Sequence, residues 1–165
     1  MNELLQSEQV RSRPTAEQRR IWRSFLESAY ALIDLLDAEL EAERGLSLPW
    51  YDVLVHLEEA GEGIGMTELA NRILFSKSGL TRVVDRMEEE GLVRRERPPG
   101  DRRAVHVVLT AKGRRELEAA RAVHRRGIEE HFAQHLDAQD FKALERALVK
   151  VRDHVRPLRP GRISD

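Results

Sequence analysis

Cysteine is absent from the 165 residues, which excludes disulfide bonds and thiol-based redox sensing. Long apolar runs are absent as well, since no segment approaches the roughly 20 consecutive apolar residues that a membrane-spanning helix needs. The first residues, Met1–Gln6, lack the basic and apolar regions of a secretory signal. We therefore expect a cytoplasmic protein with no membrane partner.

Charged residues are plentiful, but the two signs are unevenly distributed. They make up 35 % of the chain beside 41 % hydrophobic residues, which is typical of a single helix-rich domain with a sizeable core. The net charge is −1, yet residues 72–126 hold 15 Lys or Arg against 8 Asp or Glu. A basic middle segment on an acidic frame is the distribution expected when one surface meets phosphates.

Residues 66–91 predict two helices joined by a sharp turn. Apolar residues at three- and four-residue spacing indicate a first helix that Thr67 can cap and that runs to Leu74. Ser76 then offers an N-cap for a second helix, and Gly91 stands where a left-handed C-terminal residue is wanted. The second helix has an apolar face formed by Leu80, Val83, Val84 and Met87. Its other face carries polar donors near the helix N-terminus, where backbone N–H groups also favour a phosphate.

After Gly91 the apolar period changes to two, which predicts a strand hairpin. Residues 92–97 and 104–109 flank a tip, 98–103, that contains prolines, a glycine and two arginines. Residues 63–65 can add a short third strand. Helix, turn, helix and hairpin in this order predict a winged helix-turn-helix, and a projecting arginine suits the negative potential of a narrow minor groove.

These pieces resemble the MarR-type transcriptional regulators. The matching residues are Ser76–Glu88, then Gly91, Leu92, Val93 and Arg95, then Asp101, Arg102 and Arg103, and finally Leu109, Thr110 and Gly113. The resemblance spans roughly residues 18–155. It implies a homodimeric DNA-binding repressor or activator that is often released from its operator by a small molecule.

Eight residues are expected to contact double-stranded DNA. They are Ser76, Lys77, Ser78, Thr81, Arg82, Arg86, Arg102 and Arg103. Arginine is best suited to guanine edges, whereas serine and threonine are less selective. The resemblance favours Arg103 as the minor-groove residue and Asp101 as structural support of the wing. The alternative is a merely solvated helix face and hairpin charges that only aid solubility.

Asp85 lies among these residues, but a carboxylate that faces phosphates is repelled. We therefore expect Asp85 to orient a neighbouring arginine. Arg94, Arg95 and Arg97 alternate faces along their strand, so only some of them can reach a phosphate.

Long helices flank this lobe on both sides. Thr15 begins a capping-box pattern for a helix that reaches about Arg44, roughly 45 Å at 1.5 Å per residue. Thr110 caps a predicted helix over 111–135, and Asp137 caps the last helix. The first and last helices have apolar stripes longer than one small lobe can cover. We expect them to pack together and against a second copy of the chain.

The predicted fold is mainly α (α+β). A winged helix-turn-helix lobe with a two- to three-stranded wing sheet stands on a helical dimerisation base formed by the N- and C-terminal helices. We predict a single domain whose parts are a flexible arm (1–14), the base (15–46 and 111–156), the lobe (47–110) and a tail (157–165).

A candidate effector pocket consists of Trp22, Trp50, Tyr51, Asp52 and His124. Aromatic residues on helices usually belong to the core. The family resemblance, however, implies that effectors bind in the cleft between base and lobe, so we expect a small aromatic or anionic ligand. Trp22 and Asp52 resemble two members of the network in urate-responsive relatives, but Met66 stands where an arginine would be expected, and urate is not predicted.

Three histidines fall on the predicted helix over 111–135. Of these, His131 and His135 are four residues apart and could share a metal ion, whereas His124 could instead line a pocket. The sequence offers no obvious third ligand for an ion. We therefore predict no metal and no other cofactor, and leave open whether this helix ever binds one.

The sequence predicts a sequence-specific, double-stranded DNA-binding regulator, most simply a ligand-responsive repressor that acts as a homodimer on a pseudo-palindromic operator. The alternative is a winged-helix protein-interaction scaffold without DNA binding. An enzyme is not predicted, because the chain has no glycine-rich phosphate loop, no cysteine and no convincing triad.

Overall fold

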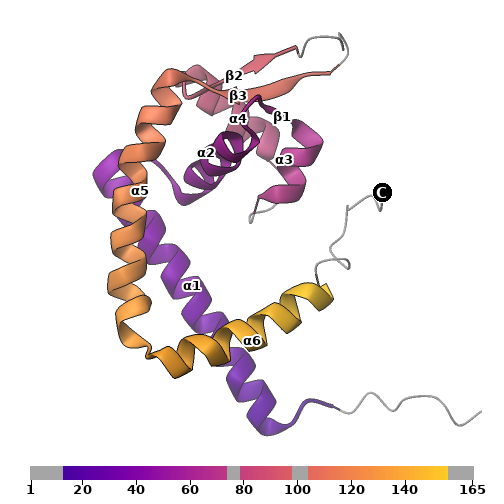
Figure 1. Cartoon of the computed structure of the whole chain (residues 1–165), viewed down its shortest axis with the longest axis vertical. Helices are drawn as coiled ribbons and strands as arrows, with labels where there is room; N and C mark the ends of the chain where they lie inside the picture. Colours follow the sequence, from indigo (N-terminus) through magenta and orange to yellow (C-terminus); the bar gives the residue numbers. More distant parts are fainter. Residues whose placement is uncertain (1–12, 74–78, 98–103, 156–165) are drawn as a thin grey trace, which may run out of the picture.

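The computed structural model describes residues 13–73, 79–97 and 104–155. Helices α1, α5 and α6 form an elongated base, and the remaining elements form a compact lobe at one end of it (Figure 1). In chain order the elements are α1 (Ala16–Arg44), α2 (Leu48–Ala60), β1 (Ile64–Gly65), α3 (Met66–Arg72), α4 (Leu80–Glu89), β2 (Val93–Glu96), β3 (His106–Leu109), α5 (Ala111–His131), the 3-10 turn η1 (Ala133–His135) and α6 (Ala138–Val155).

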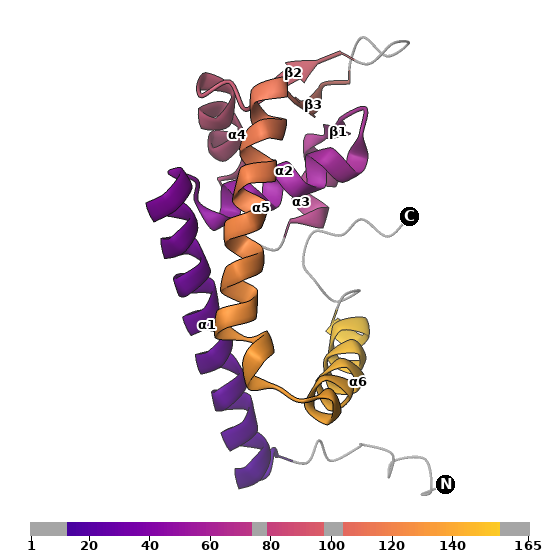
Figure 2. The ribbon, with the colours of Figure 1, turned by 60° about the vertical axis from the view of Figure 1, so that its left-hand side comes forward.

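Helix α1 begins and ends where the sequence predicts. The Thr15 hydroxyl accepts from the Gln18 backbone N–H at 3.1 Å, and the Gln18 side chain accepts from the Thr15 N–H at 2.8 Å. Gly45 ends the helix with φ 61°. In the single chain α1 packs along α5, while α6 turns away from this pair (Figure 2). The N- and C-terminal helices thus pack together in the base as predicted, with α5 as the main partner of α1 within one chain.

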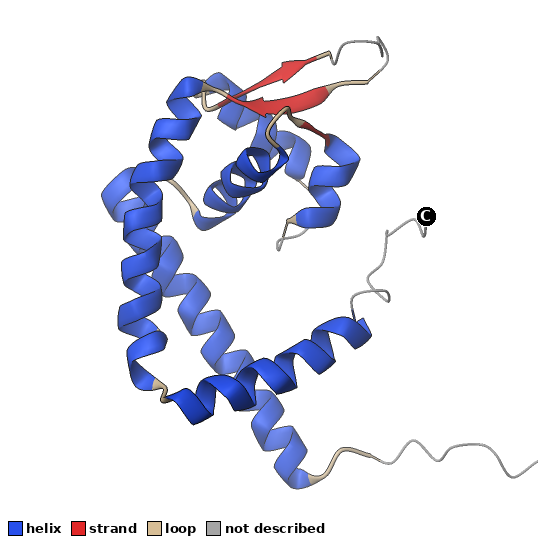
Figure 3. Ribbon diagram, in the orientation of Figure 1, coloured by secondary structure: helices blue, strands red, loops and turns tan. Residues whose placement is uncertain are grey.

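The lobe has its own aliphatic core beneath a three-stranded antiparallel sheet of order β1-β3-β2 (Figure 3). The short third strand that the sequence allowed is present, with Ile64 opposite Val107. In the longer pairing Val93 lies opposite Leu109 and Arg95 opposite Val107. Side chains from all lobe elements fill the core, among them Leu54, Leu57, Ile64, Leu69, Val84, Met87 and Val107.

Two helix starts in the lobe differ from the sequence prediction. Helix α3 begins at Met66 rather than after Thr67, because β1 runs directly into it and Gly65 occupies the N-cap position without a side-chain bond. Helix α4 begins at Leu80, with Gly79 as N-cap at φ 96°. A residue with that φ cannot lie inside a helix, so the helix predicted from Ser76 onward starts later. Ser76 itself lies outside the described residues.

The C-terminal part of the base also differs in one respect. Helix α5 ends at His131 rather than at His135, because Phe132 leaves the helical region with φ −132° and ψ −61° and a 3-10 turn follows. The Asp137 carboxylate accepts from the backbone N–H of Asp140 at 2.9 Å and caps α6 as predicted. Among the described helices, none combines the length and apolar character needed to cross a bilayer.

Candidate nucleic-acid interface

Helix α4 presents one buried and one exposed face. Leu80, Val84 and Met87 are buried in the lobe core, as the sequence predicts. On the other side Thr81, Arg82, Asp85 and Arg86 are all exposed. Since α4 is anchored by its apolar face, the polar side chains are held by a rigid element and remain available to a groove of a duplex.

The remaining predicted contact residues lie outside the described residues. These are Ser76, Lys77 and Ser78 before α4, and Arg102 and Arg103 in the wing tip, where Asp101, the predicted support of the wing, also lies. Their DNA contacts and the supporting role of Asp101 stay predictions. The structure does describe the two strands that lead to the tip. Glu96 of β2 is paired with His106 of β3 at the last position of the hairpin ladder.

Arg95 joins the wing to α4. Its guanidinium donates to the Asp85 carboxylate at 2.6 Å and also to the Glu88 carboxylate, while its backbone N–H donates to Glu88 at 2.8 Å. Burial lowers the pKa of Arg95, but the bonds to Asp85 and Glu88 outweigh it and raise the pKa overall. The prediction that Asp85 orients an arginine is confirmed. Arg94, on the other face of the strand, pairs with Glu96 instead.

A second joint fixes the lobe to α5. The Thr110 hydroxyl donates to the Gly91 carbonyl at 2.7 Å and accepts from the Gly113 N–H at 2.9 Å. Lys112 Nζ donates to the Glu90 carbonyl at 2.6 Å. Gly113 lies so close to the loop after α4 that a Cβ there would meet the Leu92 carbonyl oxygen at 2.0 Å. The start of α5 is thereby held against the end of α4 and the start of β2.

The five candidate pocket residues do not form one group in the single chain. Tyr51 and His124 stack with ring centroids 4.5 Å apart, and Asp52 acts on His124 electrostatically. Burial lowers the pKa of His124 and raises that of Tyr51. Trp22 is exposed near the start of α1 and lies beside Phe25, with centroids 5.9 Å apart.

Trp50 lines a different space. A cavity of about 440 Å³ lies where α1 and α5 meet the lobe, within the size range of small-molecule sites. Its walls come from Glu43, Arg44, Gly45, Leu46, Trp50, Glu90, Leu92, Lys112 and Glu116. Arg44 and Glu116 bridge it with an ion pair of 2.6 Å. The sequence pointed to Trp50 but not to these charged neighbours, which come from four separate segments.

Sequence reasoning also missed the charged side chains that join helices. Glu58 of α2 pairs with Arg121 and, at 3.7 Å, with Arg114, and so fastens the lobe to α5. Glu39 of α1 bonds His131 at the far end of α5. No local signal could reveal these pairs, because their members are separated by more than 50 residues.

The fold and this site define a winged helix-turn-helix protein, with an exposed recognition helix and a wing held by Arg95. A family model described as "MarR family" matches residues 44–104. The transcriptional regulator PecS of Dickeya dadantii is 30 % identical over 132 residues, 75 % of each chain. Two solved MarR-family structures from Streptomyces coelicolor are also similar to this chain.

The first, AbsC, is 33 % identical with a TM-score of 0.80, and the match covers 88 % of this chain and 99 % of AbsC. The second, Sco3205 in complex with DNA, is 32 % identical with a TM-score of 0.80, covering 87 % and 91 %. The chain belongs to the MarR family of winged helix-turn-helix transcriptional regulators. It is a DNA-binding regulator and not an enzyme, which removes the scaffold alternative.

Proposed function

We propose that the chain is a homodimeric, ligand-responsive repressor that binds a pseudo-palindromic operator. The observation that carries the proposal is the exposed face of α4, with Thr81, Arg82 and Arg86 on a helix anchored both by its core face and by Arg95. Such a helix enters one major groove, and a twofold partner sets its copy about one helical turn, roughly 10 bp, away.

Dimerisation is supported by apolar surface that one chain leaves uncovered. No residue of α6 is buried, and its apolar positions Phe141, Leu148, Val151 and Val155 are exposed. At the start of α1, Ile21 and Trp22 are more than half exposed. Two helices with unmatched apolar stripes at the same end of the base are a suitable surface for a second copy, in agreement with the division into a dimerisation base and a DNA-binding lobe.

A small aromatic or anionic effector would act through the cavity at Trp50. Its walls hold Arg44 and Lys112 beside three glutamates, and Trp50 adds an aromatic surface, at the joint where α1 and α5 meet the lobe. An anionic ligand would replace Glu116 as the partner of Arg44. A ligand bound there would stabilise a position of the lobe that does not fit DNA. The free energy of DNA binding is then reduced by at most the difference between the ligand's binding free energies for the two lobe positions.

Two arginines test the DNA site. Arg82→Ala and Arg103→Ala should each weaken binding to the DNA beside the protein's own gene by about fivefold or more, since one good base contact is worth about 1–3 kcal/mol. Arg146→Ala, which removes the same charge from α6, should leave the affinity unchanged. Equal affinity of both variants and the wild-type chain in gel shifts at fixed salt would rule out the assignment.

The effector site has its own test. The chain has two tryptophans, so Trp22→Phe leaves Trp50 as the single indole. Benzoate and related aromatic carboxylates should quench its fluorescence saturably and release DNA over the same concentration range. Saturable quenching without release would separate a binding site from a regulatory one and contradict the ligand response.

A further inference from the structure

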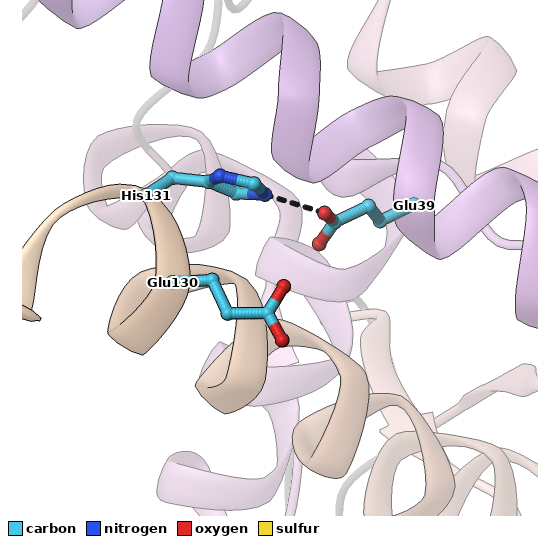
Figure 4. Close-up of side chains that lie close together, drawn as sticks. All are labelled: Glu39, Glu130 and His131. Atoms are coloured by element: carbon cyan, nitrogen blue, oxygen red, sulfur yellow. Dashed lines mark hydrogen bonds and ion pairs between the residues drawn. The ribbon is translucent and has the colours of Figure 1, made fainter.

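Helices α1 and α5 cross where α5 ends, and α1 continues past this crossing toward its N-terminus (Figure 2). There Glu39 of α1 lies beside Glu130 and His131 of α5 (Figure 4). His131 Nε2 is 2.5 Å from Glu39 Oε1, although 92 residues separate them in the chain. The helices approach closely because α5 has Gly127 one turn earlier, where a Cβ would come within 2.5 Å of Glu39 Oε2.

The second oxygen of Glu39 is left without a donor. Glu39 Oε2 is shielded from solvent and has no hydrogen-bond partner among the described residues. A carboxylate oxygen in that position costs about 1–3 kcal/mol unless something compensates it. Arg126, one helical turn from Glu130, is committed to Glu43 of α1.

The donor types suit a metal ion. One ligand atom from each of Glu39, Glu130 and His131 lies within 4.8 Å of the others. Around a zinc ion with ligand bonds of about 2.0–2.2 Å, such atoms are spaced by about 3–3.5 Å, so small side-chain rotations bring them into range. Imidazole and carboxylate together are borderline ligands, which favour zinc, cobalt or nickel over calcium.

We propose that Glu39, Glu130 and His131 bind a divalent transition-metal ion, Zn²⁺ in the first place, across the α1–α5 crossing. His131 binds through Nε2 as a neutral ring that keeps its proton on Nδ1. The buried Glu39 oxygen gains the cation it lacks. Three protein ligands leave a further coordination position for water. The ion clamps the two longest helices of the base and is independent of the operator contacts.

The test uses the metal-free full-length chain, titrated with Zn²⁺ by calorimetry and with Co²⁺ by visible absorption. We expect one ion per chain and a visible band typical of low-coordinate cobalt. Glu130→Gln and His131→Ala should each weaken binding at least about tenfold, the loss that even outer-sphere changes produce. Glu129→Gln and His135→Ala, which alter exposed neighbours outside the cluster, should bind as the wild-type chain does.

Glu130→Gln is the decisive variant, because it leaves the Glu39–His131 bond in place and cannot lose affinity simply by breaking it. In the absence of metal it should melt at the wild-type temperature, and a given Zn²⁺ concentration should raise its melting temperature less than that of the wild-type chain and the two control variants. Absence of saturable binding, or equal affinity in Glu130→Gln, overturns the site. So does an equal loss in His135→Ala, which would place the ion elsewhere.

Discussion

Asp85 and Glu88 are acidic residues on α4, the proposed recognition helix, and both bond Arg95 of the wing. Exposed ion pairs contribute little to stability, commonly 0.2–1 kcal/mol. Their value here is geometric, since the same contacts fix the hairpin relative to α4. Removal of the Asp85 charge should strengthen DNA binding if repulsion from the phosphates dominates. It should weaken DNA binding if the positioning of the wing dominates.

If positioning dominates, Asp85→Asn should weaken operator binding by about threefold to fivefold, the equivalent of the roughly 1 kcal/mol that such a pair contributes. Glu89→Gln removes the same charge from an exposed position on α4 and should bind equally well or slightly tighter. Anisotropy titrations at one salt concentration give both values. Tighter binding by Asp85→Asn would show that repulsion, and not the bond to Arg95, governs this position.

His124 makes stability depend on pH. Burial lowers its pKa below the ordinary value of 6.5, with Asp52 opposing the shift. At a pH between the two pKa values of His124, the unfolded chain binds more protons than the folded chain. The contribution of the neutral His124 to the free energy of unfolding is therefore lost as the pH falls below about 6.5. For one proton the slope cannot exceed about 1.4 kcal/mol per pH unit.

Urea unfolding between pH 7.5 and 5.5 should therefore show a smaller loss of stability for His124→Gln than for the wild-type chain. His135→Gln, at an exposed site, serves as the control and should follow the wild type. A pH slope that is the same in all three chains would contradict the assignment to His124.

At the scale of elements, the start of α5 is the joint between lobe and base. Two opposing effects act at Gly113. Alanine is favoured over glycine inside a helix by about 1 kcal/mol. Its Cβ, however, would meet the Leu92 carbonyl oxygen at 2.0 Å, and backbone cannot rotate away as a flexible side chain can. We expect the cost of this clash to exceed the gain in helix propensity.

Gly113→Ala is thus expected to destabilise the chain by about 1–3 kcal/mol, the usual cost of overpacking. Gly65→Ala is the matched variant, because nothing lies within 4 Å of its added Cβ. It should cost about 0.5–1 kcal/mol, because alanine is a poorer N-cap than glycine but meets no steric clash here. Chemical denaturation measures both, and a stabilised Gly113→Ala would mean that α5 can shift without cost.

At the scale of the whole molecule, the uncovered apolar face of α6 should be the dimer interface. Leu148→Glu places a charge in that stripe and should produce a monomer at micromolar concentration, with operator affinity at least about tenfold lower because one recognition helix must bind alone. Arg146→Glu alters the opposite face of α6 and should remain dimeric. Sedimentation velocity distinguishes the two, and a dimeric Leu148→Glu chain would place the interface elsewhere.

Local signals in the sequence determined most helices and strands of this protein. Capping residues such as Thr15, Thr110 and Asp137 act on backbone groups within a few residues of themselves. The change of apolar period after Gly91 is likewise a local signal. The exposed face of α4 follows from the same periodicity. These features depend on neighbours along the chain and can therefore be predicted from the sequence alone.

Only the tertiary structure decided which distant groups meet. The start of α4 at Leu80 depends on the backbone of Gly79, and the end of α5 depends on Phe132 leaving the helix. The cavity at Trp50 and the cluster around Glu39 join segments that are far apart in sequence. Charge pairing across a helix crossing depends on spatial position, which no periodicity along the chain encodes. Only the packing of α1 beside α5 brings Glu39 to Glu130 and His131.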